Sequence, residues 1–358
     1  MAHPRIWWHS VPHTQGEVRA VKKVVFGALG ALWGLLMLGF AGWAALAMWY
    51  RLPLVDPLRI GLGGLVILLA LVAAIGWFTS RWRLTLGCYA VAMAAVLGWW
   101  ITLQPAAQAD WSPSVARQVT GAIDGDTLRL KDVRAFRWRG ENDAEEVWED
   151  RTYDLTQLES VDFLMSHWGS PAIGHFMLSF GFADGRYLMW SVEVRRKVGG
   201  QFSAVADFFR SNTLVIVAGD ERDIAGLRSN IWGNDVYLFR LRARPENIRN
   251  MLEAYVQDAN ALAAEPRFYN SLTSNCFTVV FKLMRAVDVD TPLDWRVLAN
   301  GYLPEYAHDL GAVDTRLPMA ELRALGRIND RALADGLSDD FSAAIRAGVP
   351  VPPPLPAN

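Results

Sequence analysis

The sequence has few cysteines, and neither positive nor negative charge is in clear excess. Its two cysteines are Cys88, within a long apolar run, and Cys276, far down the polar part of the chain. A disulfide between them is therefore not expected. The formal net charge is only −2, with no long block of like charges. Nucleic acid is for this reason not an expected partner.

Charged residues are absent from three long runs near the N-terminus: Val24 to Tyr50, Ile60 to Thr79 and Leu84 to Leu103. As a helix rising 1.5 Å per residue, each run is long enough to cross a hydrocarbon core of about 30 Å. Tryptophan and tyrosine cluster at the ends of these runs, as interfacial aromatics do. We therefore predict three membrane-spanning helices rather than a signal peptide, whose apolar region is shorter.

Basic residues are distributed unequally between the two sides of these predicted helices. Six lie before the first run or between the second and third, and two lie between the first and second: Arg5, Arg19, Lys22, Lys23, Arg81 and Arg83 against Arg51 and Arg59. The positive-inside rule then predicts a cytoplasmic N-terminus. Three crossings place the chain after about Gln104 outside the cytoplasm, which is the periplasm of a Gram-negative cell, with the helices in the inner membrane.

The predicted organisation is a cytoplasmic tail (1–23), three transmembrane helices (24–103), a linker (104–113), a periplasmic domain (114–310) and a C-terminal helical extension with a Pro-rich tail (311–358). The extension is expected to be peripheral. Its last residues, VPVPPPLPAN, favour an extended polyproline conformation and are expected to add nothing to the core.

Two acidic motifs have conventional structural interpretations. Asp124-Gly125 is typical of a hairpin turn, and although DGDTLRL resembles a nuclease motif, the downstream arginine and carboxylate spacing is not evident. The segment from Ala218 to Asp223 packs three acids around Arg222, which we interpret as a solvated turn with local ion pairs rather than a metal site, because no His or Cys lies nearby. We expect a helix at 246–264 and no cofactor or metal.

Cys276 begins an apolar helical pattern, Phe277 to Val287, after a polar stretch. Thr273, Ser274 and Asn275 are good N-caps, so the thiol is expected in the first helical turn. The helix dipole and the free backbone N–H groups there favour a thiolate and an oxyanion hole. A buried, inert cysteine is the alternative, but a lone thiol in an oxidising compartment favours a nucleophile.

A thiolate nucleophile needs a base, and three of the six histidines lie on the predicted cytoplasmic tail. Of the other three, His167, His175 and His308, the second opens an alternating segment that turns at 183–185 and returns through Glu193. This pattern predicts a β-hairpin.

The register of that hairpin decides which residue faces His175. A two-residue turn pairs His175 with Val194 and mixes apolar and polar side chains on each face. A three-residue loop, with Gly185 in the left-handed conformation, gives one clean apolar face and sets Glu193 across from His175. We predict the second register, and with it a nucleophile, base and orienter formed by Cys276, His175 and Glu193. A satisfied strand histidine and a plain surface carboxylate are the alternatives. The expected supporting or substrate-binding residues are Tyr187, Ser191, Tyr269 and Asn275.

Four segments resemble the Lnb N-terminal periplasmic domain family: GHFMLSFGFADGRYLMWSVEVRR (174–196), Phe208 to Arg210, Ala218 to Asp223 and Tyr269 to Thr278. The resemblance covers roughly residues 110–347, and some members of the family are known as lipoprotein N-acyltransferases. A histidine on a hairpin followed by a cysteine at a helix start also resembles the circularly permuted papain-like fold of the lecithin retinol acyltransferase group, whose members transfer acyl chains from lipids.

The resemblance implies an α+β fold, with a permuted papain-like (cysteine-peptidase-like) domain after three transmembrane helices. It implies Cys276 as nucleophile and His175 as base. The second-strand histidine that often completes the site in that group has no match here, which leaves the third member open between Glu193 and Tyr187.

The implied reaction moves an acyl chain from a phospholipid, through a cysteine thioester, to an amine such as a lipoprotein N-terminus. The expected partners are then phospholipid, a lipoprotein or acylated substrate, and the membrane. A papain-like hydrolase or amidase of cell-wall peptide or acylated protein, and a non-catalytic membrane-anchored assembly module, are the alternatives. The sequence does not indicate an oligomeric state.

Overall fold

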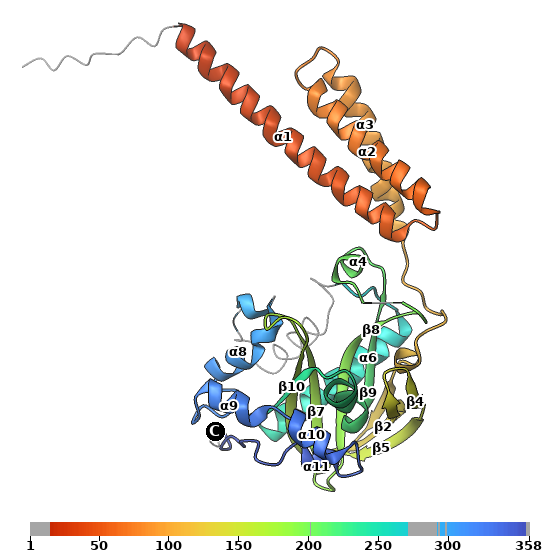
Figure 1. The fold of residues 1–358 in the computed structure, drawn as a ribbon, viewed down its shortest axis with the longest axis vertical. Helices are drawn as coiled ribbons and strands as arrows, with labels where there is room; N and C mark the ends of the chain where they lie inside the picture. The colour runs from red at the N-terminus through yellow and green to blue at the C-terminus, as the bar shows by residue number, and fades with distance from the viewer. Residues whose placement is uncertain (1–14, 201, 271–291, 293, 298, 356–358) are drawn as a thin grey trace, which may run out of the picture. The chain divides into compact units, whose positions relative to one another are not determined.

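The computed structural model of the protein describes residues 15–200, 202–270, 292, 294–297 and 299–355 (Figure 1). The chain divides into two compact units, residues 1–103 and 104–358. Asn275, Cys276 and the helix predicted at 277–287 lie outside the described residues.

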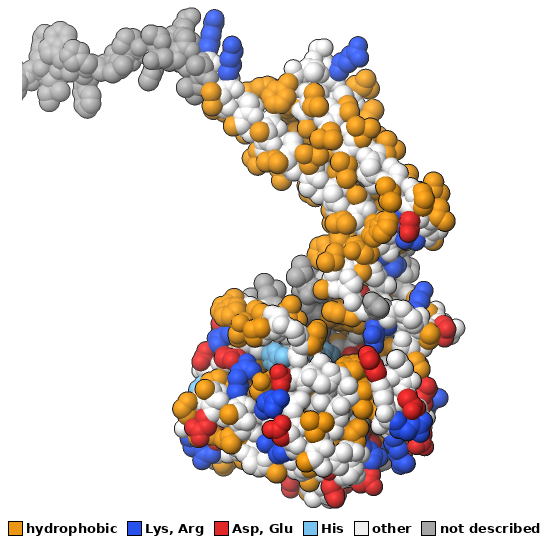
Figure 2. Space-filling model, viewed as in Figure 1, with side chains coloured by type: hydrophobic (Ala, Val, Ile, Leu, Met, Phe, Trp, Pro, Cys, Tyr) orange, Lys and Arg blue, Asp and Glu red, His pale blue; other side chains and the backbone are white. Residues whose placement is uncertain are grey.

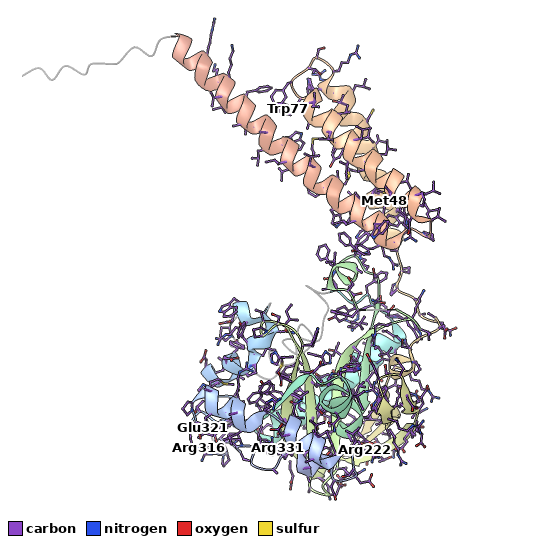
Figure 3. The ribbon with its side chains drawn as sticks, in the orientation of Figure 1. Met48, Trp77, Arg222, Arg316, Glu321 and Arg331 are labelled. Atoms are coloured by element: carbon purple, nitrogen blue, oxygen red, sulfur yellow. The ribbon has the colours of Figure 1, made fainter. Side chains whose placement is uncertain are left out.

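Three helices form the N-terminal unit: α1 (Gln15–Arg51), α2 (Asp56–Gly76) and α3 (Trp82–Thr102). Each is long and apolar enough to cross a membrane, as the uncharged runs predicted. Alanines are buried between the helices together with Met37, Met48, Tyr89 and Met93, whereas most of the large apolar side chains cover the outer surface (Figure 2). Trp77, at the end of α2, stacks on Phe26 and packs against Trp33 of α1 (Figure 3). An apolar outer surface of this kind suits hydrocarbon rather than water.

The soluble unit is built on an eight-stranded mixed sheet in which the order is β1-β2-β9-β8-β7-β6-β10 and β5 also pairs with β2. Only β2 and β9 are parallel among these pairs. Together with the three helices, this sheet confirms the predicted α+β class. The strands are β1 (Thr120–Asp124), β2 (Thr127–Arg134), β5 (Trp148–Asp154), β6 (Leu158–His167), β7 (Gly174–Phe182), β8 (Tyr187–Arg195), β9 (Thr213–Gly219) and β10 (Asp235–Arg240), with a separate hairpin of β3 (Arg137–Gly140) and β4 (Asp143–Glu145).

The β7–β8 hairpin has the predicted three-residue register. Gly181 pairs with Tyr187 and Met177 with Ser191. The amide of Phe182 donates to the carbonyl of Arg186 across a loop of residues 183–185, and Gly185 takes a left-handed φ of 85°. This register keeps the apolar side chains of one face together in a single buried cluster: Phe176, Leu178, Phe180, Phe182, Leu188, Trp190 and Val192.

Helices cover both faces of the sheet (Figure 1). On one face, α6 (Pro245–Ala264) buries Tyr255 against Phe180 and Trp190. On the other, α5 (Glu221–Gly226), α10 (Asn329–Asp335) and α11 (Phe341–Ala344) pack over β6 to β10. The strands in the middle of the sheet, β9 above all, are therefore buried along their whole length.

The remaining helices of this unit are α4 (Ala204–Phe208), α8 (Leu303–Asp309) and α9 (Met319–Gly326), with short turns η1 (Pro113–Val115), η2 (Leu155–Gln157), η3 (Leu227–Ile231), η4 (Trp295–Val297) and η5 (Asn300–Tyr302).

The C-terminal extension is not peripheral, so that prediction was wrong. Ile328, Phe341 and Ile345 are almost fully buried in the core of the second face. This face of the sheet carries Met177 and Met189, which must be covered. The covering helices are short, so their apolar residues give only a weak periodic signal in the sequence.

The acidic segment at the end of β9 is largely buried, so the interpretation of residues 218–223 as a solvated turn with local ion pairs was wrong. Asp223 pairs with Arg134 at 2.7 Å, Glu221 with Arg346 at 2.6 Å, and Asp220 with Arg151 at 2.5 Å. These arginines come from distant parts of the chain, so local sequence does not reveal them. In the described part of the chain, no group of three or more His, Cys, Asp or Glu side chains is arranged to hold a metal.

Two local predictions are confirmed. Asp124 pairs with Thr127, so the first hairpin turns through Gly125, at a φ of 58°, and Asp126. Helix α6 spans Pro245–Ala264, where the apolar spacing predicted a helix.

Candidate active site

His175 is the second residue of β7, and its side chain is only 13% exposed. Its Nε2 lies 2.7 Å from Oγ of Ser191 on β8 and 3.3 Å from Oε1 of Glu193. The hydroxyl of Ser191 donates to the same Oε1 at 2.5 Å. The predicted pairing of His175 with Glu193 is therefore present across the two strands, with Ser191 joining them.

These contacts decide where the proton of a neutral His175 lies. A serine hydroxyl has one hydrogen, and that of Ser191 is given to the Glu193 carboxylate. The serine oxygen can then only accept, so Nε2 must carry the ring proton and donate it. In this tautomer Nδ1 holds the lone pair that a general base requires.

Arg228 balances the buried charge of Glu193. Its Nη2 donates to Oε1 of Glu193 at 2.6 Å, and its Nη1 donates to the carbonyl of Ile224 at 2.7 Å. The arginine belongs to the π-helical turn η3 and is 4% exposed. The ring of Trp232 lies over the guanidinium, 5.5 Å from its carbon. This fixed cation holds the carboxylate in one orientation.

The ionisation of Glu193 follows from these neighbours. Burial opposes the charged form, but the positive charge of Arg228, with the contacts from His175 and Ser191, outweighs it and holds the pKa of Glu193 well below its usual range. Glu193 is thus a carboxylate at neutral pH. A permanent anion beside the ring favours the imidazolium that forms when His175 accepts a proton.

A clamp from η5 fixes the start of β7. The side chain of Asn300 accepts from the amide of Gly174 at 2.9 Å and donates to the carbonyl of the same residue at 2.8 Å. The amide of Gly301 donates to the carbonyl of Ala172 at 3.1 Å. A Cβ at Gly301 would lie 2.1 Å from the carbonyl oxygen of Pro171, so only glycine allows this approach. The residue next to His175 is therefore held at both of its backbone polar groups.

Residues 144–301 match the family model of the Lnb N-terminal periplasmic domain. The chain carries an Lnb N-terminal periplasmic domain. The match begins shortly before β5 and ends with the Asn300–Gly301 clamp, so it is shorter than the resemblance seen in the sequence, and it includes every residue of the site above. Comparison with curated proteins found no match, and comparison with solved structures found none either. The Lnb domain and the three apolar helices identify a membrane-anchored protein with a periplasmic domain.

The structure does not bring every predicted residue of the Lnb domain to His175. Tyr187 pairs with Gly181 at the far end of the hairpin, six residues from Glu193, or roughly 20 Å along the strand. Its ring lies 3.4 Å from the guanidinium of Arg346. Tyr269 is buried, and its amide donates to the carbonyl of Asn212.

Predictions about Cys276 and Asn275 concern residues outside the described part of the Lnb domain. The expected approach of the Cys276 sulfur to within about 4 Å of a His175 ring nitrogen therefore stays a prediction.

Two residues of the site, Arg228 and Asn300, were not predicted from the sequence. No local pattern marks either, since both act on segments far away along the chain. A buried carboxylate needs a cation or a proton, so the prediction of Glu193 implied that some cation faces it. That rule calls for an arginine or lysine but does not select Arg228.

Proposed function

We propose that this protein is a membrane-anchored periplasmic thiol acyltransferase. It moves an acyl chain from a phospholipid, through a thioester on Cys276, to an amine such as the N-terminus of a lipoprotein. The observation that supports this most is the polarised His175: its Nε2 is tied to Ser191 and Glu193, and Arg228 keeps that carboxylate charged. Such an arrangement suits a base that must serve a thiol.

In the first half of the reaction, Nδ1 of His175 takes the proton of the Cys276 thiol. The thiolate attacks the carbonyl carbon of the phospholipid ester, and the carbon–oxygen bond to the glycerol breaks. The departing alkoxide takes the proton back from the imidazolium, which leaves a lysophospholipid and an acyl thioester. Glu193 stabilises the imidazolium during this step.

In the second half, the acceptor amine attacks the thioester carbonyl and gives a proton to His175. The carbon–sulfur bond breaks, an amide forms and the thiolate is released. Water in place of the amine would make the same residues a hydrolase. The anchor favours acyl transfer, because a domain fixed to a bilayer has lipid donors and lipoprotein acceptors within its reach.

We also propose that the N-terminus is cytoplasmic, that the helices lie in the inner membrane, and that the domain is a permuted papain-like fold. The basic residues before the first uncharged run and between the second and third runs support this orientation. The fold proposal is supported by the base lying on a strand that precedes the cysteine in the sequence. A reporter fused after Asn358 should be active only in the periplasm, and activity in the cytoplasm would contradict this topology.

Intact-mass spectrometry of the full chain, purified from membranes, tests the proposed thioester. An acyl mass is expected on Cys276 in the wild type and in Cys88→Ser, which removes the other cysteine. It should be absent from Cys276→Ser. An acyl mass that persists in Cys276→Ser, or that is lost in Cys88→Ser, would refute the assignment of the nucleophile.

A further inference from the structure

Large apolar side chains are exposed at one end of the soluble unit. This is the end at which β6 and β8 finish and β7, β9 and β10 begin. The residues come from the β6–β7 connection, the β8–β9 connection with α4, and the turn before β10, and we call them the apolar rim: Trp168, Ile173, Val198, Phe202, Val205, Phe208 and Trp232. Soluble surfaces carry such side chains singly, so several together indicate a contact surface.

The opposite end of the same sheet is charged. Asp184 and Arg186 form an ion pair in the β7–β8 loop, and Arg222 pairs with Asp339 beside it. Arg222 lies at the end of the unit away from α4 (Figure 3), where acidic and basic side chains are spread over the surface (Figure 2). The apolar rim is thus a property of one end and not of the unit as a whole.

The chain enters the soluble unit at this apolar end. The carbonyl of Asp110 accepts from the amide of Val198 at 2.9 Å, and the amide of Ser112 donates to the carbonyl of Arg196 at 2.9 Å. Residues 103–109 connect Thr102, the end of α3, to Asp110. At about 3.5 Å per residue, this connection reaches roughly 30 Å at most. The connection therefore sets an upper limit on how far Asp110, and Val198 bonded to it, can lie from the end of α3.

Charge around the rim matches a phospholipid surface. The segment that carries Val198, Phe202, Val205 and Phe208 is flanked by Arg196, Lys197 and Arg210. The acid within it, Asp207, is buried. Basic residues beside exposed aromatic and aliphatic side chains are typical of segments that lie in a membrane interface. Tryptophan and phenylalanine are also typical of the apolar face of such segments.

We propose that the apolar rim inserts into the surface of the bilayer that the three helices span, with anionic and zwitterionic phospholipids as its partner. His175, Ser191 and Glu193 lie near the same end of β7 and β8. Trp232 of the rim covers Arg228, which holds Glu193. The rim therefore presents the candidate active site to lipid. Insertion does not depend on the proposed acyl transfer and would also serve a lipid hydrolase.

Depth-dependent fluorescence quenching tests the insertion. The full chain, with Cys88→Ala and Cys276→Ala, receives one NBD probe on Val205→Cys or on Leu333→Cys and is placed in nanodiscs of phosphatidylcholine and phosphatidylglycerol. Val205 lies in α4 and Leu333 in α10, outside the rim, and their side chains are similarly exposed, at 54% and 58%. A nitroxide on carbon 5 of the lipid acyl chain quenches only probes that reach the hydrocarbon.

The probe at Val205 should be quenched about twofold or more, and the probe at Leu333 hardly at all. Adding Phe202→Asp to the labelled Val205→Cys chain should reduce the quenching. Equal quenching at the two positions, or quenching at Val205 that Phe202→Asp leaves unchanged, would overturn the proposal. The background lacks Cys276, so the result is independent of the thioester experiment.

Discussion

Arg228→Met should destabilise the soluble unit strongly, because it leaves Glu193 without its permanent counter-charge in the interior. The two side chains are 5% and 18% exposed and lie 2.6 Å apart. Removing one partner of a buried pair costs about 3–5 kcal/mol, and the partial exposure of Glu193 favours the lower value. At about 2–4 °C per kcal/mol for a unit of this size, the midpoint of thermal unfolding should fall by about 6–12 °C.

The assay is thermal unfolding of the full chain in detergent micelles, followed by tryptophan fluorescence. Arg222→Met is the matched control. Its nearest partner, Asp339, is 92% exposed, and exposed pairs contribute about 1 kcal/mol or less. Its second partner, Asp220, lies 3.9 Å away and keeps its ion pair with Arg151. Adding Glu193→Gln to Arg228→Met should restore much of the loss, since a neutral amide needs no counter-charge. The reasoning is refuted if Arg228→Met falls no further than Arg222→Met, or if the double variant is no more stable than Arg228→Met.

This destabilisation should also depend on pH. Burial acts to raise the pKa of Glu193, but the positive charge of Arg228 and the contacts from His175 and Ser191 outweigh it and hold the pKa below its usual range. The stability that this depression confers is present above the unfolded-state pKa of about 4.3 and is lost as the pH falls toward the folded-state value. The difference between wild type and Arg228→Met should therefore shrink below about pH 4.

Asn300→Ala should lower stability by about 1–3 kcal/mol, because it leaves both backbone polar groups of Gly174 unpaired in a partly buried place. Asn260→Ala removes the same pair of bonds from Gly121, where both bonds are exposed, and should cost less; equal losses by thermal unfolding would contradict this account of the clamp. Burial raises the pKa of Asp207 to about 6, so its ionisation destabilises the folded state increasingly from about pH 4 through 6 and fully above that. Asp207→Asn should accordingly raise the unfolding midpoint relative to wild type more at pH 8 than at pH 4.5, and an equal or smaller gain at pH 8 would argue against a buried, ionised Asp207.

The β7–β8 hairpin shows how far local sequence predicts the candidate site. Alternation over Phe176 to Phe182 admits two registers, and only one of them keeps apolar side chains together. That single criterion predicted the left-handed Gly185 and the approach of Glu193 to His175. Ser191 was expected as a supporting residue, but its position between the two side chains required the rotamers that packing selects.

What the sequence did not predict depends on contacts between distant segments. Arg228 is 35 positions from Glu193, and Arg346 is 125 positions from Glu221. Neither pairing has a local period or motif. The C-terminal helices were missed for a related reason, since Phe341 and Ile345 are buried by a sheet face whose need for cover is evident only once the strands are assembled.

Transfer of a labelled acyl chain tests the central proposal most directly. The purified full chain is incubated with phospholipid that carries a labelled acyl group, and the protein is then treated with hydroxylamine, which cleaves thioesters. Wild type should retain the label and release it with hydroxylamine, whereas Cys276→Ser should take up none. His175→Ala should reduce the labelling by a similar factor. The double variant, with Cys276→Ser and His175→Ala, should be labelled hardly less than either single variant. Equal labelling of wild type and Cys276→Ser would contradict the acyl-transfer mechanism.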